Sequence, residues 1–435
     1  MRQAGRRSWV PDARWAVMTL LATAACSSPE AVPGPTPPAS PAATPTPPAA
    51  VPPASFLFLL QAGNNVDTYR IDAAGRVQFV FTQHPGRADA IAADPAGRRV
   101  YLAYGPRALS EMLSTDASIE LNEVDDSGNL VLRSQSRSRP WDTAFFEGCD
   151  DIGWQWLAAT EQRVWGIFRD YSGHACHTRS YIGVTSAVSP DDELGPPVIG
   201  RGPAGSGDWV NDGSAAVDPA TDVLYKGQDT GPDVWAPGPL TSYVVGSDSL
   251  LSNTGVSSLC VASDIGFASP LVAVRGYVFA SAKSPVLSTV VSGVCSWQGP
   301  RLAPRSSLGF DASRAAAYSP ADPTTPAALA MAGDVYANGI GPYQRTDLRL
   351  LSMDADGEVA LLDTAALTSS VRQLAFHPSG HYLYVVGDDG GLYSYSVAGR
   401  KLEPIETVPN VAASSYPGAS PTLMAISVVQ SDAAR

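Results

Sequence analysis

The pattern of apolar and polar positions in the stretch Val371–Val397 predicts three short β-strands joined by two tight turns. An apolar run leads into a His-Pro-Ser-Gly corner at 377–380, a second run covers 382–386, and an Asp-Asp-Gly-Gly turn at 388–391 precedes an alternating stretch. Pro, Gly and Asp supply the backbone angles that such turns need. Because a sheet of this size cannot bury a core alone, the pattern predicts a fold built from repeated sheets.

The same order of strands and turns recurs along the chain. Ala93-Asp94-Pro95-Ala96-Gly97 falls where 376–380 falls, and Val100-Tyr101-Leu102 matches Leu383-Tyr384-Val385. Further copies lie at 216–219, ahead of 223–225, and at 308–311, ahead of 317–318. Weaker copies place first strands at 145–149 and 262–267, ahead of second strands at 154–157 and 272–274. The repeats are therefore expected to be anchored near residues 94, 148, 218, 264, 311 and 377, about 57 residues apart, a spacing that suits four-stranded blades with long loops.

Six anchors and a last apolar strand at 423–429 predict an all-β fold, a seven-bladed β-propeller with four-stranded antiparallel blades. The strand at 56–60 is expected to share a blade with 423–429, which would remove the free edges of the ring. The 39 Gly and 37 Pro, with only 16% charged residues, agree with a turn-rich all-β chain. A β-sandwich followed by unrelated sheets is the alternative.

The first 25 residues predict a signal peptide. A basic start is followed by an apolar run at 15–25, roughly eleven residues, whereas a membrane-spanning helix needs about twenty. The ending Thr23-Ala24-Ala25-Cys26 resembles a bacterial lipoprotein signal, in which the cysteine is lipidated, and an ordinary cleaved signal or a wrongly assigned start is the alternative. Ser27 at the next position, where inner-membrane lipoproteins often carry Asp, favours the outer membrane in a cell with two membranes.

The predicted organisation is a lipoprotein signal peptide at 1–25, a disordered Pro/Ala/Thr-rich linker at 26–54 and the propeller at 55–432. The linker composition leaves nothing to bury and predicts an extended tether. The formal net charge is −13, and because four Arg and one Asp precede Cys26, the remainder carries −16. An acidic body repels phosphate backbones, which argues against nucleic acid as a partner.

The cysteine count agrees with export to an oxidising compartment. Apart from Cys26, the chain has Cys149, Cys176, Cys260 and Cys295, an even number. Of the three possible pairings we favour Cys149 with Cys176 and Cys260 with Cys295. Each closes a local loop of roughly 30 residues, which stabilises a fold by about 3 to 4 kcal/mol through chain entropy. Four buried free thiols are the alternative.

No metal or cofactor is expected. The group His174-Ala175-Cys176-His177 has no second ligand pair at a spacing suited to zinc. The turns at 125–128, 354–357 and 388–390 lack the terminal Glu of a calcium loop, so their Asp and Gly are expected to serve the turns. Serine-hydrolase, zincin, phosphate-loop and haem motifs do not occur.

The stretch AFHPSGHYLYVVGDDGGLYSYSV, residues 375–397, resembles a blade of the lactonase-family seven-bladed propellers. That family includes 6-phosphogluconolactonase-like proteins and surface-layer repeat proteins with a Tyr-Val-Thr-Asn motif, and looser support comes from 91–104 and 215–225. The resemblance implies the propeller fold and, for some members, lactone hydrolysis. It assigns no catalytic residue to this chain, since the motif describes blade turns rather than a reaction.

In a propeller the innermost strands line a central channel, so polar residues just ahead of the anchors are candidates for the channel mouth. Arg and Asp alternating there would bind an anionic or sugar-like ligand through charge-assisted hydrogen bonds, and solvated loop polarity is the alternative. Trp141, Trp209 and Trp235 are candidates for a sugar or partner platform or for blade packing. The candidate mouth residues are Arg87, Asp89, Asp142, Asn211, Asp212, Arg305, Arg372 and Gln373.

Two functions remain open at this point. The first is an exported, membrane-anchored module of the cell envelope that binds a small sugar-like ligand or an envelope protein. The second is a lactone hydrolase acting at the channel mouth, which would need a base to activate water and a donor for the developing oxyanion. The sequence leaves open whether the protein is an enzyme.

Overall fold

The computed structural model divides into two units, residues 1–50 and 51–435, and every residue described below belongs to the second. The predicted signal peptide, Cys26 and the tether up to residue 53 lie outside the described residues. The structure describes residues 54–428 except for 62–64, 87, 106, 110–111, 115–116, 139–151, 171–181, 202–214, 228–239, 247–250, 257–270, 284–291, 302, 309–314, 320–326, 337–342, 398–399 and 412–422.

The described strands form seven four-stranded antiparallel sheets, named blades 1 to 7, and one small hairpin. Each blade is given from its innermost to its outermost strand. Blade 1 contains β4 (Ala90–Ala93), β5 (Arg99–Tyr104), β8 (Ala117–Val124) and β9 (Leu130–Ser138), with the hairpin β6 (Arg107–Leu109) and β7 (Met112–Ser114) between β5 and β8. Blade 2 contains β10 (Ile152–Ala159), β11 (Arg163–Asp170), β12 (Ile182–Ala187) and β13 (Val198–Arg201). Blade 3 contains β14 (Ala215–Asp218), β15 (Val223–Gly227), β16 (Leu240–Val245) and β17 (Leu251–Val256).

The remaining blades follow the same order. Blade 4 contains β18 (Leu271–Val274), β19 (Tyr277–Lys283), β20 (Ser292–Gln298) and β21 (Ala303–Leu308). Blade 5 contains β22 (Ala315–Tyr318), β23 (Ala327–Tyr336), β24 (Tyr343–Met353) and β25 (Val359–Leu367). Blade 6 contains β26 (Val371–Phe376), β27 (Tyr382–Gly387), β28 (Leu392–Ser396) and β29 (Glu403–Val408). Blade 7 contains β30 (Leu423–Val428), β1 (Ser55–Leu60), β2 (Val66–Ile71) and β3 (Val77–Gln83).

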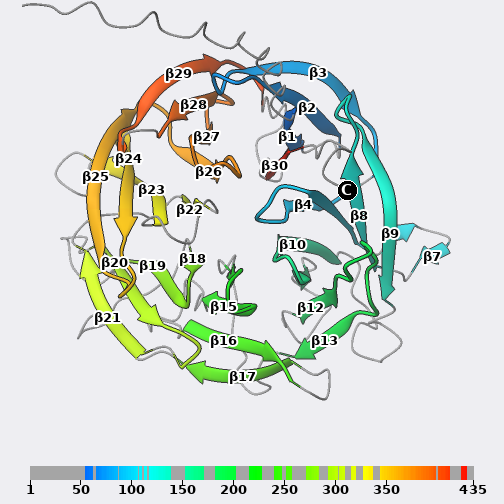
Figure 1. The fold of residues 1–435 in the computed structure, drawn as a ribbon. Coiled ribbons are helices and arrows are strands. Elements are labelled where there is room, and N and C mark those ends of the chain that lie inside the picture. Colours follow the sequence, from blue (N-terminus) through cyan, green and yellow to red (C-terminus); the bar gives the residue numbers. More distant parts are fainter. Residues whose placement is uncertain are drawn as a thin grey trace, which may run out of the picture. The chain divides into compact units, whose positions relative to one another are not determined.

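The blades form a closed ring, so the unit is a seven-bladed β-propeller, as predicted (Figure 1). The innermost strands contact one another in the cyclic order β4, β10, β14, β18, β22, β26, β30 and back to β4. The described residues contain no α-helix. Within this part of the chain, no helix has the length and hydropathy to span a bilayer.

The ring closes by pairing the two ends of the propeller sequence. β30 pairs antiparallel with β1 through six residue pairs, from Ser55 with Val428 to Leu60 with Leu423. The predicted sharing of one blade by the strands at 56–60 and 423–429 is confirmed. Since β30 supplies the innermost strand and β1 to β3 supply the other three, blade 7 is incomplete without either end.

Three of the predicted anchors are wrong. In blades 2, 4 and 5 the segments expected to be second strands, at 154–157, 272–274 and 317–318, belong instead to the innermost strands β10, β18 and β22. The corners that follow these strands lack the Asp-Pro or His-Pro sequence used to align the repeats. Of the segments predicted as first strands, 145–149 and 262–267 lie outside the described residues, while Leu308 ends the outermost strand β21.

The second strand of most blades carries a large buried ring that packs on the next blade. Tyr101, Trp165, Tyr225, Phe279 and Tyr384 each occupy the third position of a second strand and are almost fully buried. Each belongs to an apolar cluster that includes residues of the following blade. The predicted match between Tyr101 and Tyr384 therefore reflects a shared role in packing between blades.

The Asp-rich turns at 125–128 and 354–357 have the structural role that was predicted, and the turn at 72–75 is built in the same way. In the third predicted turn, at 388–390, Oδ1 of Asp389 accepts a 3.0 Å hydrogen bond from the Gly391 N–H. In the turns at 72–75, 125–128 and 354–357, the Oδ1 atom of the first Asp accepts hydrogen bonds of 2.8–2.9 Å from backbone N–H groups two and four residues later. The closing glycines, Gly75, Gly128 and Gly357, have φ angles of +79°, +88° and +81°. The described residues contain no group of three or more His, Cys, Asp or Glu that could hold a metal ion.

Each of these glycines receives a side chain from the preceding blade. A Cβ at Gly75 would collide with the ring of Tyr382, one at Gly128 with Phe56, and one at Gly357 with Tyr277. In blade 2 the matching turn carries Asp192 at a φ of 61°, and its carboxylate accepts a 2.6 Å hydrogen bond from Nε of Arg99 in blade 1. In these four blades the outer turn therefore packs against the preceding blade.

Cys295 lies buried on β20 and takes part in a disulfide. The other cysteines of the predicted pairs, Cys149, Cys176 and Cys260, lie outside the described residues, so the pairing stays a prediction. The histidines at 174 and 177 and the tryptophans at 141, 209 and 235 also lie outside them.

The outer-turn packing makes a testable prediction about stability. Gly357→Ala would incur the backbone cost of a left-handed L-residue, about 1 to 2 kcal/mol, plus an overpacking cost of about 1 to 3 kcal/mol against Tyr277. Gly276→Ala is the matched control, because Gly276 also has a φ of +81° but nothing lies within 4 Å of its would-be Cβ. Guanidinium unfolding should show the larger loss for Gly357→Ala, and equal losses would contradict the packing argument.

Candidate functional site

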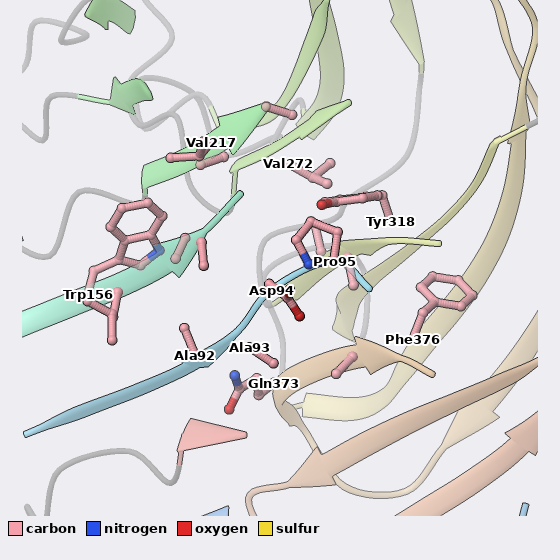
Figure 2. A pocket seen from close by; sticks show the side chains of 18 of the residues that line it. Ala92, Ala93, Asp94, Pro95, Trp156, Val217, Val272, Tyr318, Gln373 and Phe376 are labelled. Carbon is pink, nitrogen blue, oxygen red and sulfur yellow. The ribbon is translucent and has the colours of Figure 1, made fainter. Parts of the chain in front are cut away.

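A cavity of about 280 Å³ lies in the central channel, toward the carboxyl-terminal ends of the innermost strands (Figure 2). Six of the seven innermost strands contribute described residues to its wall, namely β4, β10, β14, β18, β22 and β26. Pockets for drug-sized ligands hold about 300 to 1,000 Å³, so this volume suits a small ligand.

The cavity exists because the innermost strands present small side chains to the channel. The wall includes Ala92, Ala158, Ala216, Ala316 and Ala375, each from a different blade. A larger aliphatic residue at these positions would fill the axis, as it does in small closed barrels. The lining side chains are therefore mostly apolar, although polar atoms make up nearly half of the exposed surface of the wall, and the wall is formed by strands.

Three aromatic residues and two polar groups stand out against this apolar wall. Trp156, Tyr318 and Phe376 line the cavity, together with the Gln373 amide and the Asp94 carboxylate. Figure 2 shows Tyr318, from β22, on one side of Asp94, and Gln373, from the adjacent innermost strand β26, on the other. Burial raises the pKa of Tyr318, and the carboxylates of Asp218 and Asp94 raise it further, so its hydroxyl stays protonated and neutral.

Asp94 is the acidic residue among the described lining residues, and it is only 3% exposed. Its Oδ1 atom accepts hydrogen bonds from the backbone N–H groups of Arg98 at 2.6 Å and Arg99 at 3.2 Å, which close the corner after β4. Among the described residues, no hydrogen-bond donor reaches Oδ2. The nearest cationic atom is Nε of Arg98, 3.8 Å away. Burial raises the pKa of Asp94, while these backbone hydrogen bonds and the two arginines oppose that shift.

The equivalent corner of blade 3 uses both carboxylate oxygens of Asp218. Oδ1 accepts from the Ala220 N–H at 3.1 Å, and Oδ2 accepts from the Thr221 hydroxyl at 2.7 Å and from the N–H of Gly276 in blade 4. Asp218 therefore joins two blades, whereas Oδ2 of Asp94 is buried and accepts no hydrogen bond from the described residues.

The candidate mouth residues that the structure describes are only partly brought together. Gln373 lines the cavity. Asp89 precedes β4, and its Oδ2 atom accepts a 2.7 Å hydrogen bond from the Gly105 N–H. Arg372 lies on β26, and its Nε atom lies 2.7 Å from Oδ1 of Asp388. Arg305 was placed wrongly, because it lies on β21, the outermost strand of blade 4.

The other candidate mouth residues, Arg87, Asp142, Asn211 and Asp212, lie outside the described residues.

The sequence prediction missed Asp94, Trp156 and Tyr318 as cavity residues because it placed the site at the amino-terminal ends of the innermost strands. The sequence did contain a signal for Asp94, because the Asp94-Pro95 corner was recognised as the end of an innermost strand.

No family model matches the sequence. No curated protein matches it either. Among solved structures, the chain is similar to the propeller of Dos1, with a TM-score of 0.40 and 10% identity over 74% of this chain and 72% of that one. It is also similar to the C-terminal WD40 domain of Sif2, with a TM-score of 0.40 and 10% identity over 83% of this chain and 84% of that one.

Likenesses at this level assign neither a family nor a function, and the propeller assignment rests on the strand pairing described above. The resemblance to the lactonase-family propellers has no support from a family match.

The corner of blade 6 predicts a pH dependence of stability. His377 is 8% exposed, its Nδ1 accepts a 3.1 Å hydrogen bond from the Ser379 N–H, and burial, aided by His381, lowers its pKa to about 4. The unfolded chain protonates this histidine below pH ~6.5 whereas the native state resists until about pH 4, so stability falls over that interval by about 3 kcal/mol.

His377→Asn keeps a hydrogen-bond acceptor at the corner without a titrating group. The free energy of unfolding, measured from pH 7 to pH 4, should therefore fall less steeply in His377→Asn by about 2 to 3 kcal/mol. The exposed neighbour provides the control, His381→Gln, which should keep most of the wild-type slope. An unchanged slope in His377→Asn would show that this corner does not carry the pH dependence.

Proposed function

We propose that this protein is an exported, lipid-anchored binding module of the cell envelope, whose propeller holds a small ligand or a protein partner. The observation that carries the proposal is the channel cavity, which is lined mostly by apolar side chains, exposes polar and apolar surface in nearly equal amounts and is formed by six strands. Ligand-binding sites generally have this composition. The described wall has one titratable carboxylate and a tyrosine that stays neutral.

The location within the cell is part of the same proposal. It is supported by the basic start, the short apolar run and the Thr23-Ala24-Ala25-Cys26 ending, followed by a Pro/Ala-rich stretch that would hold the propeller away from a membrane. Ser27 after the lipidated cysteine favours the outer membrane in a cell that has two. A lipid chain gives reversible attachment unless a second signal adds to it.

Lipidation at Cys26 is tested by metabolic labelling with radioactive palmitate in the bacterial host. The wild-type protein should take up label and sediment with membranes, and Cys26→Ser should lose both properties because no other residue is proposed as the lipid acceptor. Ser40→Ala, a change within the tether, is the control and should be labelled like the wild type. Label retained in Cys26→Ser would contradict the proposal.

Lactone hydrolysis is the second candidate, and the cavity contains groups on which it would depend. Asp94 Oδ2 would have to activate water, and Gln373 or Tyr318 would have to stabilise the oxyanion. The described wall holds no second acid or base beside Asp94 to relay the proton. We therefore expect binding rather than turnover.

The two candidates are separated by measuring hydrolysis of glucono-δ-lactone and a panel of related lactones by proton release. The expected result is the same rate with the protein as without it. A rate well above the spontaneous one that is lost in Asp94→Asn would replace the binding proposal with a hydrolase. Asp125→Asn, in a rim turn, is the matched control for nonspecific effects of removing a carboxylate.

A further inference from the structure

We propose that the channel cavity binds a small organic cation, in which an ammonium group is carried on an apolar body and donates to Oδ2 of Asp94. This inference rests on the proposed binding function and narrows it to one class of ligand. It differs from the anionic or sugar-like ligand expected from the sequence, because the residues that the structure brings together have the opposite charge.

The charge of the wall is the first argument. Asp94 lines the cavity, and no Lys, Arg or His is among the described lining residues. Arg98 offsets the carboxylate only in part, because its Nε lies 3.8 Å from Oδ2, its side chain is 36% exposed, and its NH2 atom also lies 3.8 Å from Glu161. An anion would meet a buried carboxylate with no described cation lining the wall to offset it.

Oδ2 of Asp94 can accept a hydrogen bond that the described residues do not supply. A buried polar atom without a partner destabilises the protein, and the cost is greater when the atom is charged. The Oδ2 atom has no donor among the described residues although the residue is 3% exposed. An ammonium group has N–H donors and a positive charge, so it can satisfy both needs of this oxygen.

The other residues of the wall suit the body of such a ligand. Alanine side chains from several blades leave room for an aliphatic or aromatic body, and Trp156, Tyr318 and Phe376 add aromatic surface. Aromatic faces attract organic cations through the negative potential of the ring. The Gln373 amide oxygen can accept a further N–H. The acidic chain, with a net charge of −13, also raises the local concentration of cations.

The proposal is tested with three probes of nearly the same shape and different charge, using the mature protein and isothermal titration calorimetry at pH 7. The probes are benzylammonium, benzyl alcohol and benzoate. Benzylammonium should bind at least tenfold more tightly than benzyl alcohol, and benzoate should show no binding. This comparison needs no variant, so it does not depend on how a substitution folds.

Two variants then locate the site. Asp94→Asn keeps an Oδ1 acceptor for the corner but removes the charge, and it should weaken benzylammonium binding at least tenfold while leaving benzyl alcohol little changed. Asp125→Asn is the matched control, since Asp125 forms the same kind of turn on the rim, and it should bind all three probes like the wild type. Ala316→Leu, which fills part of the cavity, should weaken every probe.

Other outcomes overturn the inference in distinguishable ways. Equal or tighter binding of benzyl alcohol would show an apolar cavity without charge selection, and binding of benzoate would restore an anionic ligand. No binding of any probe would reject the cavity as a cation site and leave the protein-binding part of the proposed function standing. Benzylammonium binding that survives in Asp94→Asn would place the cation elsewhere. The proposed function itself is tested separately, by the lactone assay for binding against hydrolysis and by the labelling of Cys26 for the lipid anchor.

Discussion

The packing of each second strand on the following blade is the interaction on which the rest of the structure depends. A four-stranded blade has two apolar faces and cannot cover either alone, so every blade needs a neighbour on both sides. The rings of Tyr101, Trp165 and Tyr384 pack on the following blade. Two of them also donate hydrogen bonds to that blade: Trp165 Nε1 to Asp222, and the Tyr384 hydroxyl to the Gly75 carbonyl. Such an arrangement is complete only when the last blade meets the first, which the pairing of β1 with β30 achieves.

The cavity is a consequence of that closure rather than a feature of any one blade. Residues such as Ala92, Ala216 and Ala316 are far apart in sequence and face a common space only because six innermost strands converge on one axis. Unfilled volume in a core costs stability, by roughly 24 cal/mol per Å³ in mutational series. Packing between blades, which includes many buried aromatic side chains, can offset such a cost. The residues that line the channel therefore do not have to fill it for the fold to be stable.

The sequence predicts the fold well where the turn chemistry repeats and poorly where it changes. The Asp-Pro and His-Pro corners at 94, 218 and 377 align three blades correctly, because these corners force the chain to reverse at the end of an innermost strand. Blade 4 reverses through the two-residue turn Arg275-Gly276, where both residues have positive φ, so no such corner exists. Apolar strands of similar length then fit equally well one strand earlier. The same misalignment occurs in blade 5, where Ser319-Pro320 rather than Asp-Pro follows β22, and it is why Arg305 was assigned to the channel although it lies on the outermost strand β21.

The site depends on a sequence difference between two equivalent corners, one in blade 1 and one in blade 3. Asp94-Pro95-Ala96-Gly97 and Asp218-Pro219-Ala220-Thr221 differ at their last residue, and that residue decides how the carboxylate is used. The Thr221 hydroxyl occupies Oδ2 of Asp218, whereas Gly97 has no side chain to donate to Asp94. Seven similar blades give a symmetric channel with no preferred ligand orientation. A ligand that contacts a single corner can be recognised only when that corner departs from the others, and in the described part of the ring blade 1 is where a buried oxygen is left to meet it.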